Sequence, residues 1–420
     1  MNILMIGSGG REHALILKLK KSKYAPKIYC APGNGGISKD AQCVDIPVMD
    51  FDAIIDFSLK NKIDLVFVAP DDPLAAGLVD ALEAKGIRAF GPNKAAAIIE
   101  GSKAFSKELM KKYGIPTASF EVFDNSEDAL NYIKTQNSFP TVIKADGLAL
   151  GKGVIIAECL AEAENAIKSI IEDKIFGDSG SKIVIEDFLQ GPEVSVLAFT
   201  DGKTITPMAS AKDHKRAHNG DKGLNTGGMG TISPNPYYDA KIENECMDKI
   251  FLPTIKAMEQ EGRPFKGCLF FGLMITKNGV KVIEYNCRFG DPETQVVIKR
   301  LQTDLIDIID AVIDEKLDNV DIKWNNNSVA CVVIASGGYP LEYKKGIEIR
   351  GLNEDGQLEN ATVYHAGTKI ENGKFVTSGG RILGVTCEGE TLERALENSY
   401  EAVKKISIEN SFYRTDIGKN

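Results

Sequence analysis

The amino-terminal part of the sequence alternates short apolar runs with segments of helical periodicity, and this alternation constrains the fold most strongly. It is typical of a parallel sheet joined by crossover helices, so we predict a Rossmann-like N-terminal unit. The predicted strands are Asn2–Ile6, Lys27–Ala31, Asp64–Ala69 and Ile87–Phe90. Each run ends in a loop rich in glycine, proline, Asn or Asp, and ligands bind outside the carboxyl ends of such strands. We therefore expect these loops to share one site.

The chain has 420 residues, whereas single hydrophobic cores stop growing near ~250–300 residues, so we expect several domains. A predicted helix, Lys94–Tyr113, is followed by Gly114-Ile115-Pro116, where glycine and proline oppose its continuation. We predict an N-terminal domain over residues 1–103, a second domain over 104–325 and a small strand-rich C-terminal domain over 326–420. Within the second domain, residues 119–193 are predicted to form a compact α+β unit.

Composition narrows the classes of partner. The net charge of -9 offers no general attraction for nucleic acid or anionic membranes, so any phosphate must be held by a local site. The opening apolar run breaks at Gly7 and is followed by Arg11 and Glu12, so we predict neither a signal peptide nor a membrane span. The eight cysteines lie scattered, as expected for buried residues in a reducing compartment. We expect a cytoplasmic protein.

The first loop, Gly7-Ser8-Gly9-Gly10, opens a predicted helix. A dinucleotide-binding fingerprint would need a third glycine where Glu12 stands, so that interpretation is weak. We favour backbone amides at a helix N-terminus that bind a single phosphate. A tight turn without a ligand is the alternative.

A second motif places Lys144 in an apolar strand, followed by the turn Gly151-Lys152-Gly153. Such a glycine-rich turn could fold over a triphosphate with its amides pointing inward. It is not a Walker A loop, because Gly153 opens a strand rather than a helix. Alternatively, Lys144 is an edge residue whose ammonium reaches solvent.

A third motif joins two predicted strands through Gly191-Pro192. Glu186 and backbone groups near Leu189 could meet an adenine edge, while Glu193 receives ribose hydroxyls. Acids exposed around a hairpin turn explain the same pattern equally well.

The sharpest motif begins with Glu284 and Asn286, which lie two apart on a predicted strand and therefore face the same way. Their oxygens suit one Mg²⁺. Arg288 continues the alternation and could steady phosphate charge. Asp291 precedes Pro292 at a predicted helix start, where capping alone could explain the acid.

Between these motifs, the polar segment Asp213–Gly230 is predicted to be a long mobile loop. It is followed by a helix over Asp239–Glu261 and by a hairpin with strands Gly267–Thr276 and Val280–Asn286.

In this order the motifs resemble the ATP-grasp superfamily, and within it the glycinamide ribonucleotide synthetase family. The resemblance covers nearly the whole chain. The segments that carry it are GSGGREHA at 7–14, PGNGG at 32–36, Lys144–Ala149 with Gly151–Gly153, Asp213–Arg216, Asn225–Gly230, RFGDPETQ at 288–295 and Tyr413–Gly418. Two departures are Leu224, where the family usually has proline, and Asp71 in Pro70-Asp71-Asp72-Pro73, where a longer acid is usual.

The resemblance implies an ATP-grasp core of two α+β units, with residues 119–193 covering ATP. The residues implied at ATP are Lys103, Lys144, Gly151, Gly153, Glu186, Asp187, Leu189 and Glu193. Glu284 and Asn286 are implied to hold Mg²⁺ or Mn²⁺, and Arg288, Lys152 and Asp213 to act in catalysis. The residues implied at the phosphoribosylamine substrate are Gly9, Gly10, Asn34, Asp71, Asp291, Gly380 and Arg381.

The implied reaction joins glycine to 5-phosphoribosylamine at the expense of ATP, through glycyl phosphate, in purine biosynthesis. It implies small-molecule substrates, a monomer, and a lid formed by Lys215–Gly230. The closest alternative is another ATP-grasp enzyme that activates formate or bicarbonate. A regulatory or scaffold protein on a degenerate grasp fold is a further alternative, which the lysines, the metal pair and Arg288 disfavour.

Overall fold

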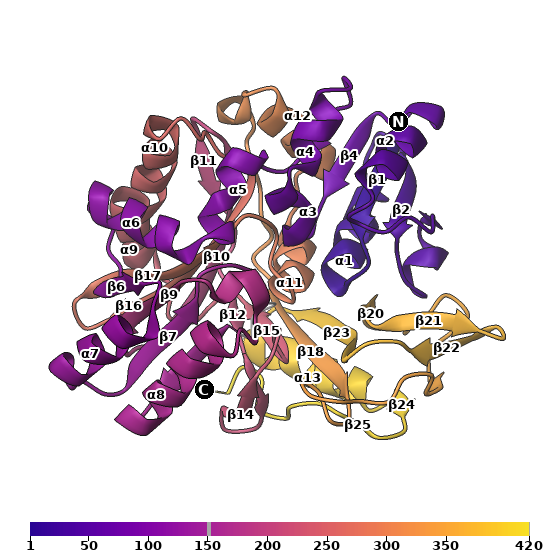
Figure 1. Ribbon diagram of the computed structural model, residues 1–420. Helices are drawn as coiled ribbons and strands as arrows, with labels where there is room; N and C mark the ends of the chain where they lie inside the picture. Colours follow the sequence, from indigo (N-terminus) through magenta and orange to yellow (C-terminus); the bar gives the residue numbers. More distant parts are fainter. Residues whose placement is uncertain (149–152, 420) are drawn as a thin grey trace.

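The computed structural model describes residues 1–148 and 153–419. Its N-terminal unit is a parallel five-stranded sheet of order β3-β2-β1-β4-β5, which confirms the predicted architecture (Figure 1). The strands are β1 (Asn2–Gly7), β2 (Lys27–Pro32), β3 (Gln42–Cys43), β4 (Leu65–Val68) and β5 (Ala89–Phe90). The helices are α1 (Gly10–Leu19), α2 (Phe51–Lys60), α3 (Asp71–Ala76) and α4 (Leu78–Glu83). Apolar side chains of β1 and β4 are fully buried between the helical layers, as a parallel sheet requires.

The helix predicted over Lys94–Tyr113 is two helices, so that prediction was wrong. They are α5 (Lys94–Gly101) and α6 (Lys103–Tyr113). Ser102 interrupts them with extended backbone, and its hydroxyl accepts from Phe105 N as the cap of α6. The same hydroxyl donates to Asp146, from the neighbouring unit. The break therefore depends on a contact that is distant in the sequence.

The small α+β unit is an antiparallel sheet of order β6-β9-β7-β8 with two helices on it. Its elements are β6 (Phe120–Phe123), α7 (Ser126–Gln136), β7 (Thr141–Ala145), β8 (Val154–Ala157), α8 (Leu160–Ile167) and β9 (Ile183–Asp187). Residues such as Ile143, Ile167 and Ile185 form a core of its own. This unit can therefore pack as a separate body over the larger sheet.

The larger sheet of the grasp core has the order β11-β10-β16-β17. It contains β10 (Glu193–Asp201), β11 (Ile205–Pro207), β16 (Lys266–Thr276) and β17 (Gly279–Asn286), with helices α9 (Ala240–Cys246), α10 (Leu252–Gln260), α11 (Glu293–Arg300) and α12 (Leu305–Ile313). The predicted β16–β17 hairpin is confirmed. The hairpin considered for the Gly191-Pro192 turn is not formed, because β9 and β10 belong to different sheets. This turn is instead the crossing between the two units.

The C-terminal unit is built on a six-stranded sheet to which the segment before α9 contributes. Its strands are β12 (Lys212–Asp213), β15 (Gly230–Ser233), β18 (Ser328–Ser336), β20 (Thr362–His365), β23 (Arg381–Gly389) and β25 (Ser411–Phe412). The helix α13 (Leu392–Val403) packs on it, and short pairs are formed by β19 (Ile349–Arg350) with β24 (Ser407–Ile408) and β21 (Thr368–Glu371) with β22 (Lys374–Thr377). An antiparallel, strand-rich C-terminal region was predicted and is confirmed.

The prediction that Asp213–Gly230 is one long loop was wrong. Between β12 and β15 the chain forms a hairpin of β13 (Arg216–His218) and β14 (Lys222–Asn225). Its tip is held by the C-terminal segment, because Gly220 N donates to Asp416 at 2.7 Å and the buried Arg414 pairs with Asp221 at 2.8 Å. Figure 1 shows the chain end beside β14.

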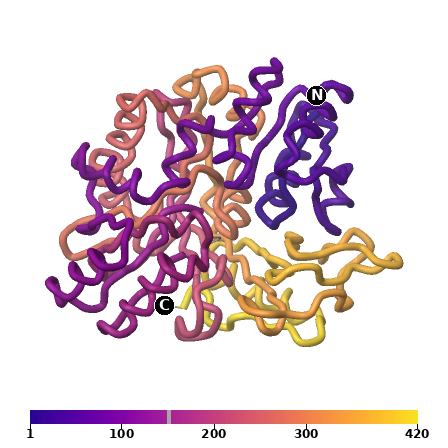
Figure 2. The backbone as a smooth tube through the Cα atoms, in the orientation of Figure 1, coloured from indigo at the N-terminus to yellow at the C-terminus, as the bar shows by residue number. Residues whose placement is uncertain are grey.

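The N-terminal and C-terminal units also meet directly, as the indigo and yellow parts of the trace show (Figure 2). His365 N donates to His13 Nδ1 at 2.8 Å, and Gly35 N donates to Thr368 O at 2.9 Å. Within the described residues, no helix combines the length and the apolar character needed to cross a bilayer.

Candidate functional site

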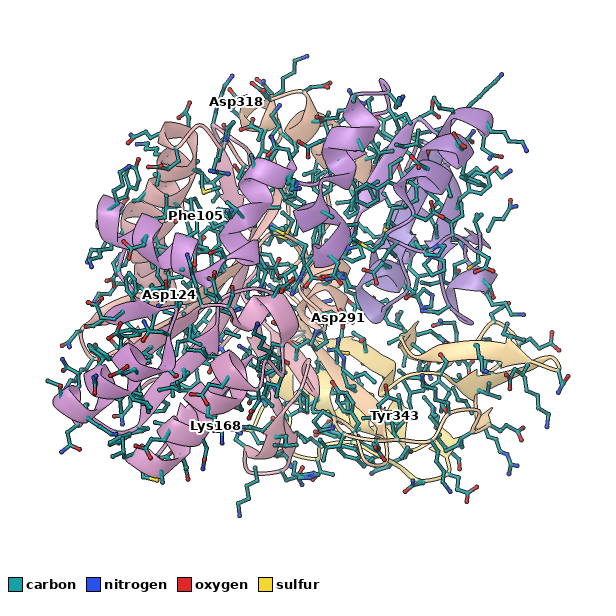
Figure 3. The ribbon with its side chains drawn as sticks, in the orientation of Figure 1. Phe105, Asp124, Lys168, Asp291, Asp318 and Tyr343 are labelled. Carbon is teal, nitrogen blue, oxygen red and sulfur yellow. The ribbon has the colours of Figure 1, made fainter. Side chains whose placement is uncertain are left out.

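A pocket of about 390 Å³ lies where the N-terminal unit, the start of α11 and the C-terminal unit meet. Its lining residues are Ser8, Gly9, Gly33, Asn34, Asp291, Tyr339, Ala366, Gly367, Thr368, Ser378, Gly379 and Arg381. Figure 3 shows Asp291 at this junction, near the middle of the molecule. Four residues predicted at the substrate, Gly9, Asn34, Asp291 and Arg381, are thus brought together.

Asp291 does not cap α11, so that explanation of its carboxylate was wrong. The residue before the helix is Pro292, and no side chain accepts there. Instead, Asp291 Oδ1 accepts from Gln295 Nε2 at 2.8 Å and lies 3.4 Å from Arg381 Nη2. Burial opposes ionisation, but Arg381 and Arg11 outweigh it and lower the pKa of Asp291. Arg381 and a negative Asp291 therefore form a polar wall of the pocket.

The amides at the start of α1 are less free than a phosphate site requires. Gly9 N donates to the Glu12 carboxylate at 2.5 Å, and Arg11 N donates to Asp291 Oδ2 at 3.3 Å. Asn34 is also fully engaged, since its Nδ2 donates to Ser8 O and to His365 O, each at 2.8 Å. These residues shape the wall, and the binding of a phosphate by the amides of this helix start stays a prediction.

The opposite wall is a close approach of two backbone segments. A Cβ on Gly367 would lie 2.5 Å from Gly379 Cα, so only glycine fits there. Gly10 and Gly380 adjoin the lining without belonging to it, and Asp71 lies outside the pocket, 4.0 Å from Arg288. Sequence reasoning missed Tyr339 and Thr368, because a single aromatic ring in a turn and a single hydroxyl at the start of β21 carry no spacing signal.

A second group of charges surrounds Lys215. Its Nζ lies 3.4 Å from Glu284 Oε1 and 3.5 Å from Glu193 Oε2, so it joins strands β10 and β17. Lys215, followed by Lys144 and Lys103, lowers the pKa of Glu284 to about 2 against the effect of burial. Lys215 was predicted only as the start of a lid. Its position makes it a candidate phosphate-binding cation.

Glu186 is held between two lysines from different elements. Lys144 Nζ lies 2.8 Å from Oε1, and Lys107 Nζ lies 2.8 Å from Oε2. All three side chains are buried, and burial lowers the pKa of Lys107 to about 8. The interpretation of Lys144 as a residue with a solvated ammonium is therefore wrong. Lys107 was not predicted, because it lies one turn beyond Lys103 in a helix of ordinary amphipathic pattern.

Contacts locate only some of the remaining residues predicted at ATP. Lys103 Nζ donates to Gly147 O at 2.9 Å, just after the end of β7. Gly153 O accepts from Ala145 N at 2.8 Å, and Asp187 is exposed at the end of β9 with the half-buried Leu189 after it. The predicted residues Gly151 and Lys152 lie outside the described part of the chain.

The metal candidates lie at the end of β17. Glu284 pairs in register with Gly272 and Asn286 with Phe270, so both side chains face the same side, as predicted. Among the described residues, no three His, Cys, Asp or Glu side chains gather as a metal site. One carboxylate and one amide nevertheless provide the oxygen donors that suit Mg²⁺, which also binds through phosphates.

Glu100 was not predicted, yet it contacts this strand end three times. Its carboxylate accepts from Asn286 Nδ2 at 2.9 Å and from Cys287 N at 2.7 Å, and it lies 3.1 Å from Arg288 Nη2. Burial raises the pKa of Glu100, while Arg288 acts in the opposite direction. No motif marks it, because its partners lie far away in sequence.

Asp213 lies near a second acid, Glu293. Asp213 Oδ1 accepts from His214 N at 2.7 Å, and Ser195 Oγ donates to Glu293 Oε1 at 3.1 Å. Burial and the charge of Glu293 raise the pKa of Asp213, and burial raises that of Glu293. A carboxyl group with a raised pKa can exchange protons near neutral pH.

Comparisons with known proteins cover almost the full length. Residues 1–100 match the family described as phosphoribosylglycinamide synthetase, N domain; residues 101–294 match its ATP-grasp (A) domain, and residues 329–420 its C domain. Phosphoribosylamine–glycine ligase of Caldanaerobacter subterraneus is 48% identical over 99% of both chains. That of Clostridium acetobutylicum is 48% identical over 100% of both.

Comparison with solved structures points to the same family. The crystal structure of phosphoribosylamine–glycine ligase from Thermotoga maritima superposes with a TM-score of 0.86 and 32% identity, covering 100% of both chains. The biotin carboxylase domain of Hydrogenobacter thermophilus 2-oxoglutarate carboxylase, solved with MgADP and bicarbonate, gives a TM-score of 0.74 at 17% identity, covering 98% of this chain and 91% of that one. The second similarity concerns the fold alone.

Proposed function

The chain belongs to the phosphoribosylamine–glycine ligase family, and we propose that its central site joins glycine to 5-phosphoribosylamine with ATP as the energy source. The observation that carries this proposal is the pocket of about 390 Å³ at the junction of the units. Arg381 and Asp291 form its polar wall, which offers a guanidinium to a phosphate and a carboxylate to a sugar hydroxyl. The family's ligase reaction belongs to purine biosynthesis.

In the proposed reaction, a glycine carboxylate oxygen attacks the γ-phosphorus of ATP, and the bond from this phosphorus to the bridging oxygen of ADP breaks. The amine of 5-phosphoribosylamine then attacks the carbonyl carbon of glycyl phosphate. Phosphate leaves, the amide forms and the amine loses a proton. Neither step needs a protein nucleophile, so the protein acts by positioning and by stabilising charge.

We assign charge stabilisation to the cations around Glu284. Lys103, Lys144, Lys215 and Arg288 are proposed to hold the phosphates, together with Lys152. Glu186, Asp187 and Leu189 would face adenine through the chain that leaves β9, and Glu193 the ribose. Glu284 and Asn286 would hold Mg²⁺ or Mn²⁺, which screens phosphate charge when bound.

The phosphoribosylamine is assigned to the pocket. Arg381 and the turn through Ser378 and Gly380 would bind its phosphate, and Asp291 a sugar hydroxyl. Asp213, whose pKa is raised by burial, is proposed as the group that accepts the proton of the attacking amine. Gly9, Gly10 and Asn34 would shape the wall, and Asp71 would act only through Arg288.

The organisation predicted from the sequence is retained as part of the proposal. It comprises domains over 1–103, 104–325 and 326–420, a cytoplasmic location and a monomer. The family segments at 1–100, 101–294 and 329–420 support this division.

A coupled assay of ADP release tests the function. Glycine, formate and bicarbonate would each be supplied with and without 5-phosphoribosylamine. We expect rapid ADP release only with glycine and 5-phosphoribosylamine together. Release that depends on formate or bicarbonate would indicate a different ATP-grasp activity, and ATP binding without glycine-dependent turnover would indicate a regulatory protein.

A further inference from the structure

The last turn of α5 delivers Glu100 from the N-terminal unit to the end of β17. Glu100 is 7% exposed and its two oxygens meet three donors, from Asn286, Cys287 and Arg288. The adjacent break at Ser102 ends α5 directly behind it. One carboxylate thus reaches two of the proposed ATP-grasp site residues.

The contact with Asn286 determines which end of its amide faces the site. A carboxylate oxygen surrounded by donors accepts hydrogen bonds, so the amide must offer Nδ2 to Glu100. Its Oδ1 is then left to face the same side as Glu284. Rotation of the amide by half a turn would present an NH₂ group, which cannot coordinate a cation.

The contact between Glu100 and Arg288 fixes the orientation of the guanidinium, as the contact with Asn286 fixes that of the amide. Arg288 Nη2 lies 3.1 Å from Glu100 Oε1 and 4.0 Å from Asp71 Oδ2, so the guanidinium is held between the N-terminal unit and β17. Charged partners fix a guanidinium through its fork of donors. The orientation of Arg288 therefore also depends on Glu100.

We propose that Glu100 is a positioning residue of the metal site, which holds the Asn286 amide with Oδ1 toward the cation and holds Arg288 beside it. The proposal rests on the metal position assigned above to Glu284 and Asn286. Partners behind metal ligands typically change metal affinity 10–100-fold when they are substituted, and we expect an effect in this range.

The test measures Mn²⁺ affinity of the enzyme–ADP complex by electron paramagnetic resonance. Glu100→Gln keeps the size of the side chain and removes its charge. We expect Mn²⁺ affinity to fall about 10–100-fold, while affinity for ADP in EDTA and the melting temperature stay close to those of the parent. Glu261→Gln is the matched control, because Glu261 contacts Lys112 and Tyr113 at the outer end of α6.

A double variant separates positioning from general damage. In Glu100→Gln with Asn286→Asp, the amide and the carboxylate exchange places. The amide introduced at position 100 can then donate to the carboxylate introduced at position 286, which keeps its second oxygen for the cation. Recovery of Mn²⁺ affinity supports the proposal. Unchanged Mn²⁺ affinity in Glu100→Gln, or an equal loss of metal-free ADP affinity and of folding, overturns it.

Glu284→Gln distinguishes this proposal from the one on which it rests. If Glu284→Gln leaves Mn²⁺ affinity unchanged, the assigned metal position is wrong and the role of Glu100 falls with it. If Glu284→Gln weakens Mn²⁺ binding and Glu100→Gln does not, only the role of Glu100 is overturned.

Discussion

At the scale of single residues, Arg381 connects the proposed substrate pocket with the chain segment that precedes β15. It donates from Nη1 to Asp291 O at 2.8 Å and to Gly227 O, and its Nη2 lies 3.4 Å from Asp291 Oδ1. Its side chain is 20% exposed, so the guanidinium borders the pocket and still reaches its partners. It is the cation that lines this pocket within the described residues.

Substitution Arg381→Ala should raise the KM for 5-phosphoribosylamine on the order of 10²-fold, because a charge-assisted contact to phosphate is lost. The KM for ATP should change less, since Arg381 lines the pocket and none of the lysines around Glu284 does. Steady-state kinetics with phosphoribosylamine generated in situ would measure both values. Arg394→Ala, at an exposed arginine on α13, is the control. An unchanged KM in a folded protein would remove Arg381 from the substrate site.

How well single residues could be predicted depended on the range of their contacts. Glu284 and Asn286 were assigned to one face from strand periodicity, and the ladder with β16 confirms it. Glu100 and Lys107 could not be predicted, because Lys107 pairs with Glu186, 79 residues away, and the partners of Glu100 begin at Asn286, 186 residues away. Asp291 precedes Pro292 as a helix cap does, and local rules could not foresee that its partners are arginines of other elements.

At the scale of elements, the β13–β14 hairpin is connected to the C-terminal segment by polar contacts. Arg414 is fully buried, pairs with Asp416 at 2.8 Å and with Asp221 at 2.8 Å, and donates to Arg216 O. Asn219 exchanges hydrogen bonds with Thr415. The end of the chain therefore holds the hairpin, which is part of the predicted lid, in place.

The variant Arg414→Lys should loosen this hairpin, because an ammonium cannot reproduce the fork that reaches both aspartates. Hydrogen exchange followed by mass spectrometry should show amides of residues 216–225 exchanging at least about tenfold faster, a local opening. Strands β10 and β16 should be unaffected. Arg350→Lys, at an exposed ion pair with Glu348, serves for comparison. Equal protection in the two variants would contradict the fastening role.

The elements themselves were predicted where patterns are local. Apolar runs located the parallel strands, and Lys277-Asn278-Gly279 located the β16–β17 turn. The break at Ser102 was missed because its cap is reinforced by Asp146 from another unit. The β13–β14 hairpin was missed because its sequence is polar and its support comes from residues after 410.

At the scale of the whole molecule, two buried histidines, His214 and His365, lie where segments distant in the sequence meet. His214 Nδ1 lies 3.1 Å from Gly230 O, and its Nε2 accepts from Gly418 N at 3.0 Å, so a neutral ring satisfies both contacts. Burial lowers the pKa of His214 to about 4 and that of His365, at the contact with His13, to about 3.

These histidines predict acid sensitivity. Between pH 6.5 and about 4 the unfolded chain binds more protons than the folded one, so stability falls as pH falls through this window. For His214 the loss should be on the order of 3 kcal/mol at pH 4. His214→Gln keeps a donor and an acceptor but does not titrate, so its denaturant-derived unfolding free energy should depend less on pH. Parallel pH curves for both proteins would contradict this assignment.

The anchoring of the β13–β14 hairpin by the C-terminal segment also determines the order in which parts of the chain fold during synthesis. Asp416 follows Gly220 by 196 residues, so a ribosome that has completed the hairpin must continue for about 10–40 s, at 5–20 residues per second, before the anchor exists. The N-terminal sheet and the grasp core can fold in that interval. The nascent chain therefore acquires its core first and its fastened hairpin last.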